Sequence, residues 1–539
     1  MDYTLKRDKE LANLFNTIPS NATYTSNNIQ NEIIEHMSKI VTEEIVRDIA
    51  EEWYTLKVDG TKDPTGCENI SIVLRYVDKT NCVKERLLSM ATTQHFYAIS
   101  LTKLIISQLK ENGLSTGKIL SQCYDGASVM SGTQGGVQKV LQEELQREVP
   151  YVHCFNHQLH LVIVHVMRSE NALANFFDVC SSLYKYFRKP TVSAVYTGQK
   201  LKRLLEQRWT GHLATVTVIM NSFSNIFSLL QQMEDSQTSS TDVRLEATGL
   251  LKAITQPSFH FIACITHKVL SLLDPPNTLL QAHTTNLYTG VSVIQSALKC
   301  VGELRCESEF DILWEEFSKE RESAEPPTVP AQKRRRQSTQ WKDFVVDTTF
   351  GQNRMEGEKT ECKRLYFSIL DGVVGEMSTR FSERNSKFIQ ALSALHPRSE
   401  SFLDGDKVKP LLDLTGMEFK EAEFSVAQRF LKDEIAKSDD NCTTAGILQR
   451  YSDALSAMPT VLQTLKIGLT FGASTATCES SFSTLKNVFS DHRRSMLHRR
   501  KANLIQLAVE RDLTCKFTGE WKEKLLRRFN TASRRLQLF

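Results

Sequence analysis

Three acidic residues spread along the chain stand where carboxylates could do metal-dependent chemistry. Asp125 directly follows the apolar run 119–124, Asp59 ends the strand-like stretch 53–59, and Glu479 lies among small residues at the start of a helix-like segment. Mg²⁺ binds a few carboxylates and keeps open positions for substrate phosphate. Two such ions, roughly 4 Å apart, can hold the attacking and leaving oxygens of an in-line phosphoryl displacement. The three acids therefore predict a two-metal site, if the fold brings them together.

Each of these acids also has a plainer interpretation. Asp-Gly dipeptides such as Asp125-Gly126 and Asp59-Gly60 are common in turns, and Asp125 would also suit a helix N-cap. Glu479 lies among Ser and Thr residues and could be a capping residue. Asp63 is a rival for the role of first acid. The position of Asp125 after a buried strand favours the site interpretation.

The elements that must position these acids follow an informative order. Three strands joined by short loops predict an antiparallel meander, and helix, strand, helix, strand and helix come after it. That order is typical of an α/β ribonuclease H-like mixed sheet, in which the first and fourth strands lie side by side. Acids at the ends of those two strands would point into one crevice. The predicted strands are 53–59, 70–77, 85–91, 119–124 and 151–153, and the predicted helices are 95–112, 134–148 and one starting near Cys154.

The start of that last helix carries Cys154, His157 and His160, a spacing that invites a zinc assignment. Structural zinc needs four ligands, and one turn of helix cannot close a tetrahedron alone. His153 or His165 could join the group. A histidine satisfied within the core is the commoner outcome, and the two interpretations stay open at this point.

Composition describes a globular, soluble protein without a membrane segment. The chain has 539 residues, of which 41% are hydrophobic and 24% charged, and no run of 18 apolar residues occurs. Twelve cysteines are scattered singly, which suits a reducing compartment. Net charge is only +3, but Lys486 to Phe539 holds fourteen Lys or Arg against five Asp or Glu. This basic end predicts a polyanionic partner, although a solvated helix face is the alternative.

Pattern and composition divide the chain into five parts. We predict a helical lead-in (1–50), the first part of the sheet core (51–215), a large all-α insertion (216–460), the last part of the core (461–515) and a basic tail (516–539). Within the insertion, residues 322–342 are Pro-rich and then basic, which predicts a disordered loop. The run Lys333–Arg336 in this loop could act as a nuclear-import signal.

Five separated segments together resemble the hAT superfamily of DNA transposases. They are VDGTKDPTGCENISIVLRYVD from Val58, CYDGASVM from Cys123, the Cys154-x-x-His157 element, the pair Arg208-Trp209, and ATCESSFSTLKNVFSDHRRSM from Ala476. The similarity spans roughly residues 50–515, and the likeness is greatest to transposon-derived proteins of the zinc finger MYM-type-1 kind. The five matches in the correct order carry it, because motifs such as Arg-Trp are uninformative alone.

The resemblance implies a ribonuclease H-like catalytic core split by a helical insertion, with Asp59, Asp125 and Glu479 as an Asp-Asp-Glu triad that binds two Mg²⁺ or Mn²⁺ ions. It implies that Trp209 stacks on a DNA base while Arg208 supports phosphate, and that Cys154 and His157 lie near the DNA. It also implies a C-terminal dimerisation region, a homodimer or higher homo-oligomer, DNA as partner, a nuclear location, and no membrane or small-molecule substrate.

Two departures from the family pattern stand out. An acidic or polar residue usually follows the first Asp, whereas Gly60 does so here. The N-terminal zinc finger that recognises transposon ends is not seen before Cys67. We therefore keep two main hypotheses, an active transposase core that cleaves DNA and transfers strands, and a domesticated, non-catalytic nuclear protein that dimerises and binds DNA or chromatin. A protein-interaction scaffold is a third possibility.

Overall fold

The computed structural model describes residues 25–204, 210–323, 354–381, 386–437 and 442–532, with residues 13, 16 and 17 before them. The chain forms two compact units. The first contains Met1–His157, Leu280–Gly290 and Asn385–Phe539, and the second contains Gln158–Leu279 and Val291–Arg384. These limits differ from the predicted domains, since the helical unit begins well before residue 216 and ends well before residue 460.

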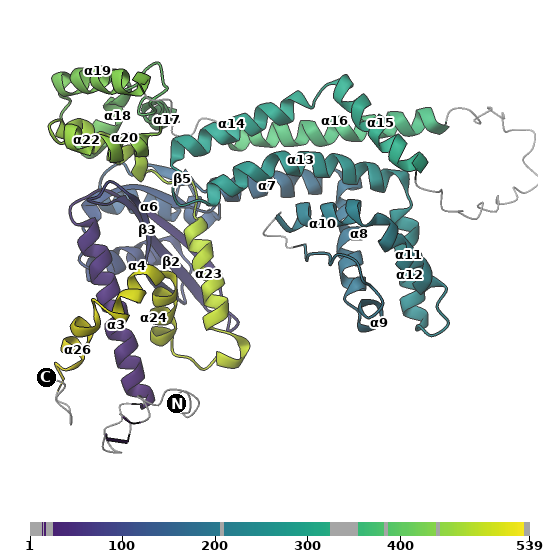
Figure 1. Cartoon of the computed structure of the whole chain (residues 1–539), viewed down its shortest axis with the longest axis horizontal. Helices are drawn as coiled ribbons and strands as arrows, with labels where there is room; N and C mark the ends of the chain where they lie inside the picture. The colour runs from purple at the N-terminus through teal and green to yellow at the C-terminus, as the bar shows by residue number, and fades with distance from the viewer. Residues whose placement is uncertain are drawn as a thin grey trace, which may run out of the picture. The chain divides into compact units, whose positions relative to one another are not determined.

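A five-stranded mixed sheet lies at the centre of the first unit (Figure 1). The spatial order is β3-β2-β1-β4-β5, in which β1 pairs antiparallel with β2 and parallel with β4. The predicted ribonuclease H-like order, with the first and fourth strands adjacent, is confirmed. The strands are β1 (Tyr54–Lys62), β2 (Glu68–Val77), β3 (Val83–Thr93), β4 (Ile119–Tyr124) and β5 (Tyr151–His153).

The two turns of the β1–β2–β3 meander use the same side-chain chemistry. Asp63 accepts a hydrogen bond from the backbone N–H of Thr65 at 2.9 Å, and Asp78 accepts one from Thr80 at 2.9 Å. In each turn the carboxylate also accepts from the threonine hydroxyl. Because an Asp side chain that bonds to the backbone two residues on mimics a turn, each Asp-x-Thr sequence fixes its hairpin.

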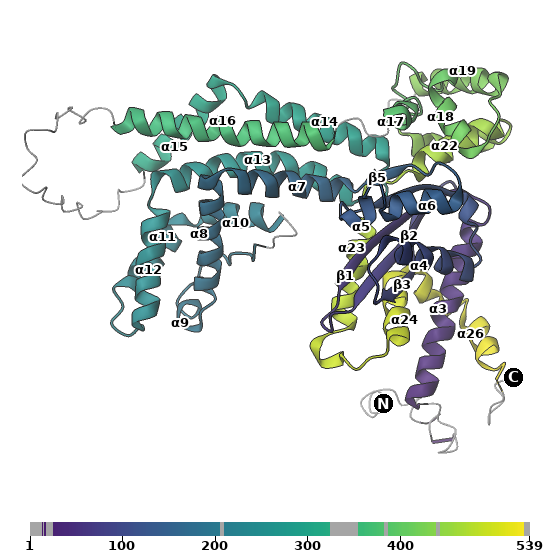
Figure 2. The same ribbon diagram turned by 180° about the vertical axis from the view of Figure 1, so that it is seen from behind.

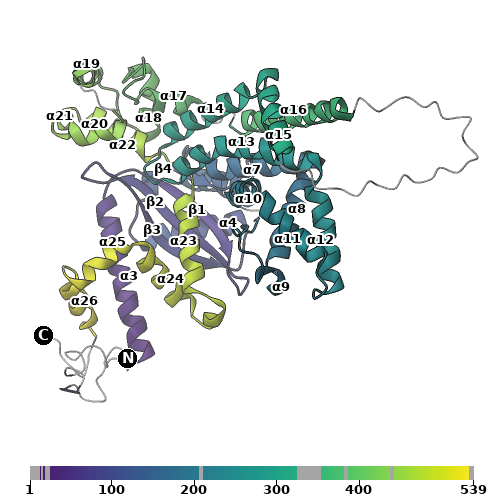
Figure 3. The same cartoon turned by 45° about the vertical axis from the view of Figure 1, so that its right-hand side comes forward.

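The two faces of the sheet differ in chemistry because successive strand residues point to opposite sides. Helices α4 (Ala98–Glu111) and α6 (Val137–Leu145) cover an apolar face, as Figure 2 shows. The other face is polar toward β1, and α23 (Ala476–Val488) crosses it (Figure 3). On β1, Tyr54, Leu56 and Val58 belong to the apolar face, and Thr55, Lys57 and Asp59 to the polar one.

The edge strand β3 is closed by side chains of α24 (His498–Val509) and the residue that follows it. Glu510 accepts the backbone N–H of Leu87 at 2.6 Å, and Gln506 donates to the carbonyl of Leu88 at 2.9 Å. Unpaired edges invite intermolecular strand pairing, so these contacts protect the sheet.

Much of the basic surplus near the C-terminus is neutralised inside the first unit. Lys501 pairs with Asp63 at 2.7 Å and Arg528 with Glu43 at 2.7 Å, and Arg499 pairs with Glu35. Glu35 and Glu43 belong to α3 (Asn27–Ile49), against which α26 (Lys522–Phe529) packs. These basic residues therefore form ion pairs within the first unit, whether or not the region also binds a polyanion. Residues 533–539 of the predicted tail lie outside the described part.

Five helices that the sequence assigned to the insertion pack with α22 (Pro459–Thr470) in the first unit instead. Their apolar residues face α22, which in turn contacts β2. This packing explains why the boundary falls near residue 385. The helices are α17 (Ser386–Ser393), α18 (Gly405–Thr415), α19 (Glu421–Lys437), α20 (Thr444–Arg450) and α21 (Ser452–Ser456).

The second unit is entirely helical where it is described, and an aromatic cluster that includes Phe261, Phe310 and Trp314 forms part of its core. No single described helix is long and apolar enough to cross a bilayer, and only the bent pair Gly211–Asn221 and Phe223–Glu234 together reach that length. Its helices are α7 (Phe155–Ser169), α8 (Asn171–Phe187), α9 (Pro190–Ser193), α10 (Thr210–Asn221), α11 (Phe223–Glu234), α12 (Thr241–Ile254), α13 (Pro257–Gln281), α14 (Leu287–Glu303), α15 (Glu307–Ser323) and α16 (Arg354–Arg380). The predicted disordered loop after residue 323, with Lys333–Arg336, lies outside the described residues.

Candidate functional site

Asp59 and Asp125 come just beyond the last paired residues of two adjacent parallel strands, β1 and β4. The β1–β4 ladder pairs Thr55 with Ser121 and Lys57 with Cys123, and the members of each pair are 66 positions apart. The same offset joins Asp59 to Asp125, which directly follows the last residue of β4. Both residues are half-buried, and their shared offset puts the two acids at the same end of the β1–β4 ladder.

Asp59 does not end its strand, as the sequence predicted, because β1 continues to Lys62. Beyond Lys57 the strand loses its β4 partner but stays paired with β2, where Asp59 lies opposite Ser71. The carboxylate accepts the N–H of Gly60 at 2.8 Å. A Cβ at Gly60 would lie 3.3 Å from Cδ1 of Ile70, a close contact that a larger residue could make only if Ile70 shifted slightly.

Glu479 lies in the first turn of α23, over the polar face that carries Asp59. Two residues later, Ser481 hydrogen-bonds the hydroxyl of Ser71, the cross-strand partner of Asp59, at 2.9 Å, so α23 lies on the face of the sheet that carries Asp59. Burial, with the negative charge of Asp59, raises the pKa of the Cys478 thiol well above its usual value. The helix acid is thus on the same side of the sheet as the strand acids.

The three acids share this face without forming a closed ligand set. Within the described residues, no group of three or more His, Cys, Asp or Glu side chains stands close enough together to hold a metal ion. Neither the carboxylates of Asp59, Asp125 and Glu479 nor Cys154 with its neighbouring histidines forms such a group among the described residues. Their chemistry still suits Mg²⁺, because all three donors are carboxylate oxygens.

Cys154 is fully buried at the junction between β5 and α7. Its backbone N–H donates to the carbonyl of Tyr124 at 2.8 Å, and its sulfur accepts the N–H of Thr475 at 3.3 Å. Burial raises the pKa of this thiol to about 11, and the negative charge of Glu479 acts in the same direction. Its side chain has no exposed surface and packs the junction between β5 and α7, while the role near DNA expected of Cys154 stays a prediction.

His153 and His157 stand over the loop that follows Asp125. Their ring centroids are 5.7 Å apart, and a Cβ at Gly126 would lie 2.6 Å from the His153 ring. The hydroxyl of Tyr151 donates to the carbonyl of Asp125 at 3.0 Å. His157 therefore lies close to the residue after the second acid, and any side chain larger than glycine at position 126 would require the His153 ring to move. Of the other candidate zinc ligands, His160 is buried in α7 and His165 pairs with Glu376 at 3.4 Å.

Asp63, the rival first acid, is committed to the β1–β2 turn. Its carboxylate accepts hydrogen bonds from Thr65, Cys67 and Asn69 and pairs with the buried ammonium of Lys501. Burial alone would raise its pKa, but Lys501 and these hydrogen bonds hold the pKa well below its usual value. These contacts favour Asp59 as the first acid.

Arg208 and Trp209 lie outside the described residues, so their predicted contacts with phosphate and base stay predictions. Within the helical unit, α7, α8 and residues 203–204 line a hollow of about 490 Å³. Its lining includes Phe177 and His212, whose rings meet edge-on with their centroids 5.1 Å apart. Four cations line this hollow with one carboxylate, that of Asp178, and the cations are Arg168, Lys185, Arg188 and Arg203.

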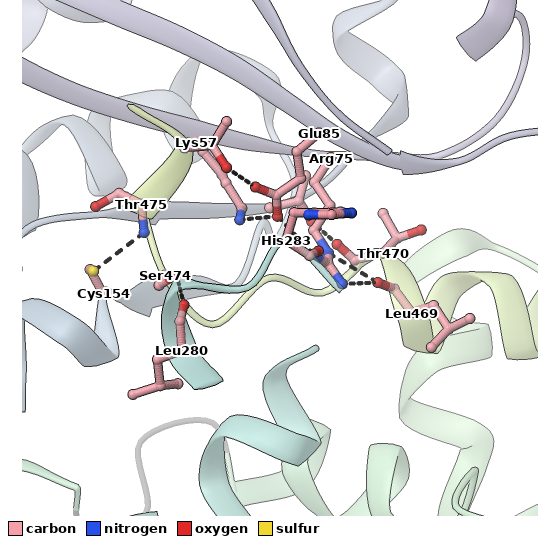
Figure 4. Close-up of polar contacts among 12 residues, drawn as sticks. Lys57, Arg75, Glu85, Cys154, Leu280, His283, Leu469, Thr470, Ser474 and Thr475 are labelled. Carbon is pink, nitrogen blue, oxygen red and sulfur yellow. Dashed lines mark hydrogen bonds and ion pairs between the residues drawn. The ribbon is translucent and has the colours of Figure 1, made fainter. Parts of the chain in front are cut away.

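A buried ion cluster beside the site escaped prediction from the sequence. Glu85 of β3 accepts from Lys57 of β1 and, at 2.7 Å, from Arg75 of β2 (Figure 4). The three side chains are at most 2% exposed. The only sequence signal was that Lys57 lies two residues before Asp59, on the same face of β1.

Two parts of the chain match known families, one before and one after the helical unit in the sequence. Residues 2–136, with Asp59 and Asp125, match the ZMYM1/FAM200, RNase-like domain. Residues 427–508, with Glu479, match the hAT family C-terminal dimerisation region. An RNase-like domain and this dimerisation region on one mixed-sheet core define a hAT transposase-derived protein.

A human protein named 52 kDa repressor of the inhibitor of the protein kinase is similar to this chain. The two are 21% identical over 326 residues, a match that covers 55% of this chain and 41% of the human protein. The chain therefore spans about two fifths of the length of this curated relative.

Proposed function

We propose that this protein is a DNA-binding homodimer whose sheet carries a Mg²⁺-dependent site for DNA cleavage and strand transfer, formed by Asp59, Asp125 and Glu479. The shared offset of Asp59 and Asp125 carries the proposal, because both acids come at the same end of the β1–β4 ladder, Asp59 within β1 and Asp125 directly after β4. Glu479 approaches the same face from α23. His157 stands beside the second acid, where it would contact the DNA strand being processed.

The chemistry assigned to the acids is phosphodiester hydrolysis or exchange. The three carboxylates would hold Mg²⁺, which supplies Lewis-acid activation of the attacking and leaving oxygens when bound. Asp59 and Asp125 are oriented by the backbone N–H groups of Gly60 and Ala127, at 2.8 and 3.3 Å. An ionised carboxylate has two oxygens with about four lone-pair sites in all, so one such hydrogen bond does not use its whole accepting capacity.

DNA cleavage tests this assignment directly. We expect the full-length wild-type protein to nick supercoiled plasmid with Mg²⁺ or Mn²⁺, and Asp125→Asn to reduce the rate by at least about a hundredfold, because the electrostatic role of a reacting-centre group is of that order. Asp274→Asn, which changes a half-buried acid of α13, serves as the matched control. Equal, negligible nicking by wild type and Asp125→Asn would contradict the enzymatic role.

A second function, a non-catalytic nuclear DNA- or chromatin-binding dimer, is favoured by the open arrangement of the acids. No described group of three ligating side chains is assembled, and the protein could bind DNA without cutting it. The basic hollow supports DNA binding in either case, since four cations against one carboxylate suit phosphate. Nuclear import by Lys333–Arg336 belongs to this proposal, and a fluorescent full-length chain with these residues changed to Ala should leave the nucleus.

Salt dependence separates DNA binding from nonspecific adhesion. Lys185→Ala with Arg188→Ala should weaken binding to a DNA duplex and reduce the slope of log affinity against log salt by about 0.9 for each phosphate that is no longer neutralised. Lys252→Ala, an exposed lysine on α12, should leave the slope unchanged. A protein that fails to bind DNA even at low salt would point instead to a protein-interaction scaffold.

A further inference from the structure

The first turn of α23 is tied to the sheet by a hydroxyl that lies two residues before Glu479. Thr477 donates its side-chain hydroxyl to Glu85 of β3. The side chain of Glu85 is only 2% exposed, so this hydrogen bond is shielded from solvent. Hydrogen bonds to a charged acceptor are stronger and shorter than neutral ones. The contact can therefore hold the helix more firmly than the hydroxyl pair of Ser481 and Ser71.

The acceptor of this bond is itself held by two cations. One Glu85 oxygen accepts from Lys57 and Arg75 (Figure 4). The other oxygen accepts from Thr477. Burial would raise the pKa of Glu85, but the charges of Lys57 and Arg75 outweigh burial and lower the pKa. The carboxylate thus stays ionised as a fixed acceptor for Thr477.

Arg75 extends the same cluster to the segment that leads into α23. Its guanidinium donates twice to the carbonyl of Leu469, at 3.1 and 2.9 Å, and once to the carbonyl of His283. Thr55 of β1 donates to the next carbonyl, that of Thr470, at 2.7 Å. Residues 469–477 are therefore held to the sheet at both ends by buried polar groups.

Glu479 lies on the opposite flank of α23 from Thr477. Residues two apart on a helix are about 200° apart around its axis, because each residue turns the helix by about 100°. Thr477 reaches toward β3, at one edge of the sheet, whereas Glu479 raises the pKa of Cys154, which follows β5 at the other edge. A contact on the first flank therefore sets the rotation of the helix, and with it the position of Glu479.

Small rotations matter at this radius. A helix with its side chains is about 10–12 Å across, so a turn of about 10° about the axis moves a side-chain tip by about 1 Å. A displacement of about 1 Å at a reacting centre can reduce a rate about a hundredfold. The Glu85–Thr477 hydrogen bond restrains rotation of α23 about its axis, and this rotation is the motion that most displaces a metal ligand on the helix.

We propose that Glu85 and Thr477, held by Lys57 and Arg75, are positioning residues that fix α23 in the rotation that brings Glu479 toward Asp59 and Asp125. This proposal rests on the proposed function, since it takes Glu479 to be a metal ligand. The ion cluster does more than stabilise the fold, because one of its hydrogen bonds ends on the turn of α23 that carries Glu479. The same bond explains why a buried Glu-Lys-Arg cluster lies on the face that carries the acids.

The experiment uses the full-length chain and four variants. Thr477→Val removes the hydroxyl with little change of shape, and Thr477→Ser restores it. Thr464→Val is the matched control, because Thr464 is a buried threonine of α22 whose hydroxyl bonds within its own helix, to the carbonyl of Thr460 at 2.7 Å. Asp125→Asn reports on the metal site itself. Two quantities are measured for each protein, hydrogen exchange of the backbone amides of residues 477–482 and the affinity for Mn²⁺ by electron paramagnetic resonance.

We expect Thr477→Val to speed amide exchange in this segment and to weaken Mn²⁺ binding by about tenfold or more, the scale set by misplacement of a ligand. Thr477→Ser should restore both quantities, and Thr464→Val should change neither. Unchanged exchange in Thr477→Val would overturn the proposal. So would faster exchange with undiminished Mn²⁺ affinity, provided that wild type binds Mn²⁺ better than Asp125→Asn does. If wild type binds no better than Asp125→Asn while exchange responds as expected, the metal site is wrong and the anchoring of α23 stands.

Discussion

The backbone amide of Thr475 donates to the sulfur of Cys154 at 3.3 Å, across 321 positions of the chain. On the other side of Cys154, its own amide donates to the carbonyl of Tyr124, one residue before Asp125. One buried thiol therefore links the end of β4 to the start of α23, the two places that carry the second and third acids. This link gives Cys154 a structural reason to lie beside the site without contacting a substrate.

Cys154 should resist alkylation in the folded protein. Because burial raises the pKa of its thiol to about 11, only roughly a thousandth of it is thiolate at pH 8, and the thiolate is the nucleophile. We expect Cys154 to react with iodoacetamide at least about a hundredfold more slowly than the exposed Cys67 and Cys300. Peptide mapping by mass spectrometry after timed labelling measures the rates. Equal rates would show that the β5–α7 junction opens readily.

Glu85→Gln should destabilise the protein at neutral pH and much less in acid. Removing one partner of a buried ion pair costs about 3–5 kcal/mol, because Lys57 and Arg75 lose their counterion. The pKa of Glu85 is lowered in the folded state, so its contribution is fully present above its unfolded pKa and is lost as pH falls through the lower folded value. Urea unfolding at pH 7 and at successively lower pH measures the difference between wild type and variant.

The control for this prediction is Glu361→Gln. Glu361 pairs with Arg364 on the surface of α16, where both side chains are more than half exposed. Exposed pairs contribute little, so this change should leave the unfolding free energy nearly unchanged at every pH. If the difference in unfolding free energy between wild type and Glu85→Gln increased in acid, ionised Glu85 would not be the form that stabilises the fold.

The order of the strands could be predicted from sequence because it depends on local patterns. Each strand is a short apolar or alternating run, and the three-strand meander followed by strand and helix leaves few topologies. The adjacency of Asp59 and Asp125 followed from that topology. The end of β1 could not be placed, because the hairpin of β1 and β2 continues past the last residue paired with β4.

The buried Lys57, Arg75 and Glu85 could not be predicted by the same reasoning. Charged residues on alternate strand positions ordinarily indicate a solvated face. Here segments far along the chain, including α22 and α23, cover that face and supply carbonyl and hydroxyl partners. Only the long-range packing of the folded chain shows that this face is covered. The same packing places residues 385–460 in the first unit, whereas the sequence predicted them in the helical unit.

Gly472→Ala should destabilise the first unit. A Cβ at this position would lie 2.6 Å from Cε of Lys57 and 3.2 Å from Cδ of Arg75. Lys57 cannot withdraw without leaving Glu85, so we expect a loss of about 1–3 kcal/mol, the range for overpacking a core. Gly375→Ala in α16 is the matched control, since nothing lies near its Cβ, and it should stabilise the helix by about 0.5–1 kcal/mol. Denaturant unfolding measures both, and a neutral Gly472→Ala would show that the ion cluster has room to shift.

Leu497→Glu should weaken self-association. Leu497 is 75% exposed and lies within residues 427–508, which match the hAT C-terminal dimerisation region. A large apolar side chain left in water at the start of α24 would be buried by a second copy of the chain, and a charge there would enter the interface unpaired. We expect the dimer dissociation constant, measured by analytical ultracentrifugation, to rise by about tenfold or more, which corresponds to about 1.4 kcal/mol. Leu245→Glu is the control, because Leu245 is 66% exposed on α12, outside the matched region. If Leu497→Glu dimerises like wild type, the interface lies elsewhere, and if both variants dissociate equally, the effect comes from added charge and not from a specific surface.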